Sequence, residues 1–167
     1  STSFPVGNTR HGFSERVTAY EPGVEEDSPQ NLMDKPLMTF EMDGNCFEAM
    51  GLPLLQGRTF LPRDGAPEAE SVVIIEEQLA RKIRPDDHAV GTLIQHGWGP
   101  EMEVCRVVGV VPNLQTLAGV TSEWSSIYEP LRADRVPKYI HLRLANPSPH
   151  AEAALVRNIS GQIRQLD

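Results

Sequence analysis

The fifteen residues "SVVIIEEQLARKIRP", 71–85, carry the strongest secondary-structure pattern of the sequence. They open with an apolar Val-Val-Ile-Ile run, which predicts a buried strand. Ile75, Leu79 and Ile83 then recur at four-residue spacing, so they share one face of a helix that Pro85 ends. The charges complement the helix dipole, with Glu76 and Glu77 in the first turn and Arg81, Lys82 and Arg84 in the last. A strand that leads directly into a helix is therefore one unit of the predicted fold.

The segment before this unit has the same strand-then-helix order. Residues 36–42, "PLMTFEM", are predicted to form a strand. The turn at Asp43-Gly44-Asn45 leads into a helix of about two turns, which Gly51 and Pro53 are expected to end. The first 35 residues are mostly turn and loop sequence around two short strand candidates, 2–6 and 16–20. They are expected to form a poorly packed lobe, or strands that pair with a later part of the chain.

The segments after residue 85 read mainly as strands. Residues 90–96 and 103–111 are predicted strands joined by a Gly-Trp-Gly-Pro turn, and the second, apolar on both faces, should be central. Residues 125–131 are predicted to form a short edge strand that Pro130 ends. Residues 138–145 alternate between apolar and polar side chains, which predicts a strand with one face in water.

A last helix is predicted from Ser148, as N-cap, and Pro149, at the first helical position. Leu155, Ile159, Ile163 and Leu166 form one apolar stripe, by which this helix is expected to pack on the sheet. The order of elements predicts an α+β fold, a mixed β-sheet with helices packed on one face plus a small β-rich lobe. The predicted boundary separates a loose β-rich lobe or partial subdomain, 1–42, from an α/β core domain, 43–167.

Composition limits the classes of partner. The 167 residues include 15 Lys and Arg against 23 Asp and Glu, a net charge of -8, and no stretch combines basic with aromatic residues. Nucleic acid is therefore not an expected partner. No run approaches the roughly 18 apolar residues of a membrane span. Cys46 should open a helix while Cys105 lies in a strand, which favours two buried thiols over a disulfide.

The sequence offers little that suggests catalysis. Asp86, Asp87 and His88 are adjacent in a polar turn where their side chains diverge, which favours a solvated loop over a metal or acid–base site. Gly97-Trp98-Gly99 lacks the third glycine and the following helix of a dinucleotide fingerprint. Surface positions are expected for the other four histidines, His11, His96, His141 and His150. No catalytic, cofactor-binding or metal-ligating residue is predicted, and the chain is not expected to be an enzyme.

Four stretches together resemble a known family. "NCFEAMGLPLLQGRTF", "VVIIEEQLARKIRPDDHAVGTLI", "EVCRVVGVVPNLQTLAGV" and "SIYEPL" follow in one order. They are similar to the MacB-like periplasmic core domain of ABC transporter permeases, in the MacB and FtsX superfamily and especially its macrolide-export permease branch. The chain departs from the family pattern at Asn45-Cys46-Phe47, at Glu76-Glu77 and at Pro112-Asn113. Each departure lies at a turn or cap, so it leaves the expected fold unchanged.

The resemblance implies a location and partners. Such a domain lies between the first two membrane helices of a permease, on the extracytoplasmic, periplasmic side of the bacterial inner membrane. Residues 43–167 would be its porter-like core. ATP would bind a separate cytoplasmic subunit or domain that acts through the membrane helices. The domain would move with those helices and contact a second permease subunit or a periplasmic partner protein, with no catalytic residue and no cofactor. An uncovered sheet edge or apolar patch is expected to make this fragment self-associate.

Other readings of the same residues stay open. A free-standing soluble ligand-binding or metal-dependent hydrolytic domain would assemble a site from Asp64, Asp86, His88 and His141. A sensory or adhesion module of a membrane protein is a third reading. Arg58, beside the apolar bend at 51–55, is expected to bind a backbone carbonyl or a carboxylate, or to be an exposed loop arginine.

Overall fold

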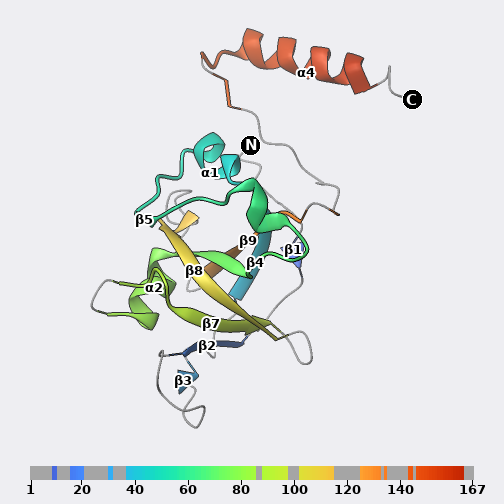
Figure 1. Ribbon diagram of the computed structural model, residues 1–167. Helices are drawn as coiled ribbons and strands as arrows, with labels where there is room; N and C mark the ends of the chain where they lie inside the picture. The colour runs from blue at the N-terminus through green and yellow to red at the C-terminus, as the bar shows by residue number, and fades with distance from the viewer. Residues whose placement is uncertain are drawn as a thin grey trace.

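A computed structural model describes residues 9–10, 16–20, 30–31, 37–85, 88–97, 102–114, 125–132, 134, 143–144 and 146–163. Figure 1 shows the arrangement of the elements. The strands are β1 (Thr9–Arg10), β2 (Arg16–Tyr20), β3 (Gln30–Asn31), β4 (Leu37–Met42), β5 (Gln56–Gly57), β6 (Val72–Glu76), β7 (Leu93–Gly97), β8 (Glu103–Val111) and β9 (Ser125–Pro130). The helices are α1 (Asn45–Met50), the short 3-10 helix η1 (Pro62–Gly65), α2 (Glu77–Ile83) and α4 (Pro149–Ile163).

One mixed sheet contains all these strands, in the order β1-β4-β9-β6-β8-β7-β2-β3, with β5 added on β8. The β4–β9 and β6–β8 pairs are parallel, whereas β7 pairs with β8, and β9 with β6, antiparallel. The predicted α+β class with a mixed sheet is therefore confirmed. Early and late parts of the chain share this sheet, because β2 pairs with β7. The division at residue 42 stays a prediction.

The structure differs from the sequence predictions at two strand segments. The segment 125–131 was expected at an edge, but β9 lies between β4 and β6, so that prediction is wrong. Its first four residues are buried even though two are serines. The Ser126 N–H donates to the buried Glu76 carboxylate, whereas the Ser125 hydroxyl is buried with no hydrogen-bond partner among the described residues. Most of the predicted strand 138–145, and all of 2–6, lie outside the described residues; Arg143 and Leu144 are described and are not in a strand.

The core consists of two apolar clusters on opposite faces of β6. Val73 and Ile75 belong to the cluster that α2 covers through Leu79, Ala80 and Ile83. Val72 and Ile74 belong to the other cluster, which is rich in aromatic rings; those are Phe40, Phe47, Phe60 and Tyr128. Alternate residues of a strand point to opposite faces, so a continuous apolar run is needed where both faces are covered. α1 and α2 thus contact different faces of the sheet.

The last helix begins where expected but does not pack as expected. The Ala151 N–H donates to Ser148 Oγ at 3.1 Å, which confirms the predicted N-cap. Every residue of α4 whose exposure is described is half-buried or exposed, and Figure 1 shows α4 apart from the sheet. The expectation that its stripe packs on the sheet is therefore wrong. Helical periodicity shows which face can be buried but contains no information on what covers that face.

Candidate functional site

The apolar bend after α1 connects two layers of the molecule. Gly51 ends α1 with φ at 72°, and the Leu52 N–H donates to the Phe47 carbonyl oxygen at 2.8 Å. The chain then joins β8, because the Leu55 N–H donates to the Val110 carbonyl at 2.8 Å. The Arg58 N–H donates to the Val108 carbonyl at 2.9 Å. Residues 51–58 therefore link α1 to the central strand of the sheet.

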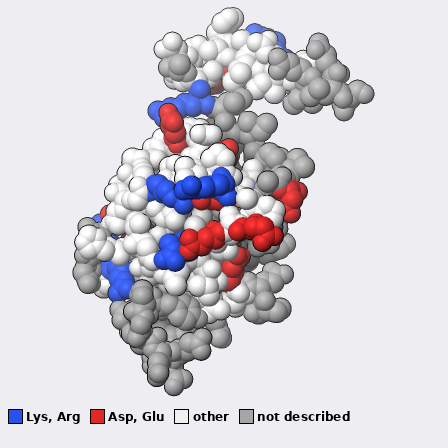
Figure 2. All heavy atoms as spheres, in the orientation of Figure 1, with Lys and Arg blue, Asp and Glu red and all other residues white. Residues whose placement is uncertain are grey.

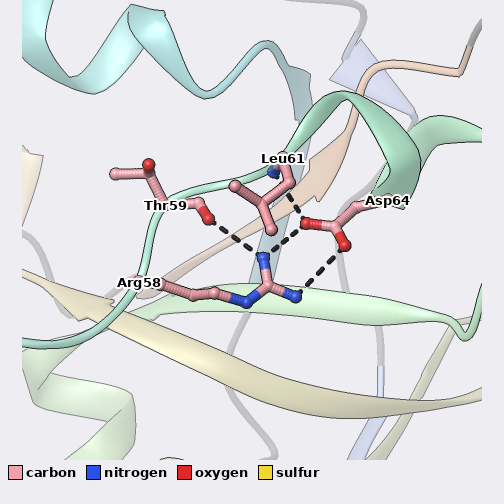
Figure 3. Close-up of polar contacts among 4 residues, drawn as sticks. All are labelled: Arg58, Thr59, Leu61 and Asp64. Carbon is pink, nitrogen blue, oxygen red and sulfur yellow. Dashed lines mark hydrogen bonds and ion pairs between the residues drawn. The ribbon is translucent and has the colours of Figure 1, made fainter.

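Arg58 fixes the chain just beyond this bend (Figure 3). Its Nη1 lies 2.5 Å from Asp64 Oδ2 and its Nη2 lies 3.1 Å from Asp64 Oδ1. Nη1 also donates to the Thr59 carbonyl at 3.0 Å, and the Leu61 N–H donates to Asp64 Oδ2 at 2.8 Å. Arg58 thus binds both a carboxylate and a backbone carbonyl, two of the expected alternatives. This bidentate geometry is the strong form of a carboxylate–guanidinium ion pair.

The same contacts set the protonation of Asp64. Burial raises the pKa of this carboxyl group, but hydrogen bonds from Arg58 and the Leu61 N–H, with the Arg58 charge, outweigh burial and lower it overall. The Asp64 side chain is only 7% exposed. Its two oxygens are occupied by Arg58 and Leu61, which leaves it poorly placed to bind a metal.

Glu76 forms the centre of a buried polar cluster with Leu114, Ser126 and Tyr128, called here the Glu76 cluster. Its Oε1 accepts bonds from the Leu114 N–H and the Tyr128 hydroxyl, and its Oε2 from the Ser126 N–H, each at 3.0 Å. The sequence placed Glu76 in the first helical turn as a partner of the dipole. It lies instead at the end of β6, as the N-cap of α2, and is 1% exposed.

The Glu76 cluster joins two distant parts of the chain to the β6–α2 junction. Leu114 follows β8, and Ser126 lies in β9. The Glu76 carboxylate therefore binds one backbone N–H just before residues 115–124 and another just after them. Beside it, the Gln78 N–H donates to Asn113 Oδ1 at 3.0 Å, and Asn113 Nδ2 donates to Gln78 Oε1 at 3.2 Å. Burial raises the pKa of Glu76 and, together with the Glu76 charge, that of Tyr128.

His96 is also buried, contrary to the expected surface position. It is 3% exposed, and its Nε2 lies 3.5 Å from Cys105 Sγ and 3.5 Å from Glu129 Oε1. Burial, then the charges of Glu103 and Glu129, raise the pKa of Cys105 to about 12. The sequence signal was the alternation of residues 93–97, which places His96 on the same face as buried Ile94.

The other candidate residues do not form a site within the described structure. His88 and His150 are exposed, as expected. Cys46 and Cys105 are free thiols, again as expected. His11, Asp86, Asp87 and His141 lie outside the described residues. Within the described ranges, no group of three or more His, Cys, Asp and Glu side chains could hold a metal ion.

One shallow hollow of about 210 Å³ lies between β5 and α2. Its lining includes apolar Leu55, Ala80 and Val110 together with Glu77 and Arg81. Glu77 and Arg81 are paired with each other at 2.6 Å. Among the helices described, none is both long enough and apolar enough to cross a membrane.

The buried polar groups of Glu76 and Asp64 hold backbone segments together around a mixed α+β sheet. Comparison with known proteins identifies the family that has this fold. The chain belongs to the MacB-like periplasmic core domain family, whose model matches residues 5–157. It is therefore the extracytoplasmic domain type of an ABC-type transporter permease. No curated protein sequence matches the chain.

One solved structure shares this fold at low sequence identity, and two others match with lower TM-scores. The periplasmic region of MacB from Actinobacillus actinomycetemcomitans is 16% identical, with a TM-score of 0.57, over 94% of this chain and 64% of that one. The extracellular domain of the noncanonic ABC-type transporter YknZ from Gram-positive bacteria is 19% identical, with a TM-score of 0.44, over 75% and 52%. A permease domain from Porphyromonas gingivalis is 17% identical, with a TM-score of 0.45, over 89% and 68%. The chain thus spans 64% of the MacB periplasmic region.

Proposed function

We propose that this domain is non-catalytic and couples movement of the membrane helices of its permease to substrate export or to contact with a partner. The observation that carries the proposal is the bend at residues 51–58. Two backbone hydrogen bonds attach it to β8, and the Arg58–Asp64 pair fixes the chain that follows. A link of this kind makes α1 and the central sheet move together, since both ends are held by short polar contacts.

The proposed setting is the periplasmic side of the bacterial inner membrane, within a membrane-embedded parent chain. The partners are a second permease subunit or a periplasmic protein, together with a cytoplasmic ATP-binding subunit that acts through the membrane helices. Leu54 and Leu55 are 38% and 45% exposed, and Val104 is 48% exposed. Exposed apolar side chains favour association, so the 167-residue chain is proposed to self-associate at high concentration. Light scattering that finds only monomer over a wide concentration range would count against this.

Spectroscopy on the intact permease tests the coupling. Glu68 is exposed, so a spin label can be attached to a Glu68→Cys variant in a Cys46→Ser background. Pulsed electron double resonance then measures the distance between the labels of two permease subunits. ATP is expected to change this distance. Arg58→Ala should broaden the distance distribution, because the bend loses its side-chain contact. The matched control is Arg132→Ala, which removes an exposed arginine paired with Asp134. A distance that ATP does not alter would contradict the proposal.

The reading frame around the chain gives an independent test. Apolar segments of about 20 residues are expected on both sides of the domain if it belongs to a permease. The alternative, a free-standing soluble ligand-binding or metal-dependent hydrolytic domain, predicts heat stabilisation by Zn²⁺ or Mg²⁺. The two readings therefore differ in both tests, and a metal-dependent rise in melting temperature would favour the alternative.

A further inference from the structure

The His96–Glu129 contact joins strands that are not neighbours. His96 lies on β7 and Glu129 on β9, and the sheet order β9-β6-β8-β7 places two strands between them. Their side chains nevertheless approach to 3.5 Å, with 4% and 15% of their surfaces exposed. A flat sheet separates strands by about 4.8 Å each, so this approach requires a sheet curled onto itself. The contact therefore closes the curled sheet on the face that contains Cys105 and Ile94.

Acidic residues share the face of the sheet that contains His96. Glu103 is opposite His96 in the β7–β8 register, and Cys105 Sγ lies 3.5 Å away on the same strand as Glu103. Glu41, on β4, is the register partner of Glu129 on β9 and is 2% exposed. On the remaining side, β2 places Val17 opposite His96 and Arg16 opposite Gly97. The Cys105 thiol and the Glu129 carboxylate thus lie 3.5 Å from the imidazole, and register places Glu103 of β8 and Glu41 of β4 on the same face of the sheet.

We propose that the His96–Glu129 contact is a proton-dependent link that tightens the curl of the sheet when the extracytoplasmic medium becomes acidic. Histidine is the side chain whose charge ordinarily changes between about pH 5 and 8. A separation of 3.5 Å is at the outer limit of a hydrogen bond. When the imidazole gains a proton, both of its nitrogens become donors and the bond to Glu129 becomes charge-assisted.

The surroundings of the contact are acidic. Strand register places Glu103, Glu129 and Glu41 on the face of the sheet that contains His96. The Cys105 thiol, whose pKa is raised to about 12, stays neutral throughout and does not compensate the acidic groups. The physiological meaning of the link rests on the extracytoplasmic location, but its chemistry is testable without transport.

A double-mutant cycle on the 167-residue chain tests the link. His96→Gln, Glu129→Gln and the double variant are unfolded with urea at about pH 5.5 and at about pH 8, on either side of the usual histidine transition. The cycle gives a coupling factor in the unfolding equilibrium constant. This factor is expected to be on the order of tenfold larger at the lower pH, because a charge-assisted hydrogen bond is stronger than a neutral one. The cycle cancels other titrating groups. His88→Gln, at an exposed histidine, is the matched control and should show no coupling to Glu129.

Equal coupling at both pH values, or stronger coupling at the higher one, would overturn the proposal. A second measurement needs no variant. The nitrogen resonances of the His96 ring in the wild-type chain report its protonation directly, and they should change from the neutral to the charged pattern as the pH falls. A ring that stays neutral over this range would also overturn it. Both experiments use the isolated chain. A negative result would therefore overturn the His96–Glu129 link without contradicting the proposed role of the domain in transmitting movement of the membrane helices.

Discussion

At the scale of single residues, Glu76 is the side chain on which most backbone contacts converge. Replacement by alanine leaves the partly buried Leu114 N–H, the buried Ser126 N–H and the buried Tyr128 hydroxyl without their acceptor. Unsatisfied buried donors are costly, so Glu76→Ala is expected to lower the free energy of unfolding by about 3 kcal/mol. Urea unfolding at neutral pH measures this loss.

The neighbouring glutamate provides the control for that experiment. Glu77 is one residue further on, but its side chain is 41% exposed and its pairing with Arg81 is at the surface. Exposed pairs contribute little, so Glu77→Ala should cost no more than about 0.5 kcal/mol. Equal losses in the two variants would mean that the Glu76 cluster does not stabilise the fold.

The two cysteines should differ in reactivity. Alkylation requires the thiolate, and burial raises the pKa of both thiols, that of Cys105 to about 12. Cys105 is also 3% exposed, whereas Cys46 is half-buried. Iodoacetamide is therefore expected to modify Cys46 first, and Cys105 only after unfolding in urea. Mass spectrometry of the folded chain checks this, and modification of Cys105 at the rate of Cys46 would contradict it.

At the scale of elements, the contact between β5 and β8 depends on a glycine. Gly57 has φ at 74°, and a Cβ atom there would overlap the Val108 carbonyl oxygen. Gly57→Ala is therefore expected to cost at least about 3 kcal/mol, from left-handed backbone strain and the clash together. Gly161, inside α4, has no neighbouring atom within 4 Å of an added Cβ. Gly161→Ala should instead favour the helix by about 0.5–1 kcal/mol.

Thermal unfolding followed by circular dichroism measures both glycine variants. The opposite signs make each variant the control for the other, because both add the same methyl group. A Gly57→Ala protein that melts at the wild-type temperature would show that β5 can leave β8 without loss. The link between α1 and the central sheet would then lose its physical basis.

The elements that the sequence predicted correctly are those whose pattern is local. The β6–α2 unit and the end of α1 at Gly51 depend on periodicity, charge and caps within a few residues. β9 was wrongly predicted at an edge, because its interior position depends on distant contacts such as the bond from the Ser126 N–H to Glu76, 50 residues away in sequence. Strand order is set by such distant contacts, which no local window contains.

At the scale of the whole molecule, the Arg58–Asp64 and His96–Glu129 contacts were only partly predictable from the sequence. Arg58 was singled out because it stands beside an apolar bend, and its partner Asp64 is six residues away. His96 and Glu129 are 33 positions apart and meet only because the sheet curls. Curl is a property of the assembled sheet, arising from the twist of all its strands, so the burial of His96 could not be read from its neighbours in sequence.

The stability of the whole chain should depend on pH through two buried carboxylates that act in opposite directions. The pKa of Asp64 is lowered from 3.8, so its contribution is present above that value and is lost as the pH falls through its folded-state pKa. The pKa of Glu76 is raised from 4.5. Its contribution is complete below that value and is lost as the pH rises through its folded-state pKa.

Variants with an uncharged amide side chain separate the pH effects of Asp64 and Glu76. Relative to Asp64→Asn, the wild-type chain should have its largest advantage at neutral pH, and the advantage should shrink below about pH 4. Relative to Glu76→Gln, the wild-type chain should gain stability as the pH falls toward 4.5, below which the contribution of Glu76 is complete. Urea unfolding over a series of pH values gives both profiles, with Glu77→Gln as the control for removing a surface carboxylate. If the Asp64 and Glu76 profiles slope in the same direction, the surroundings described for one of the two carboxylates are wrong, because burial and ion pairing shift a carboxyl pKa in opposite senses.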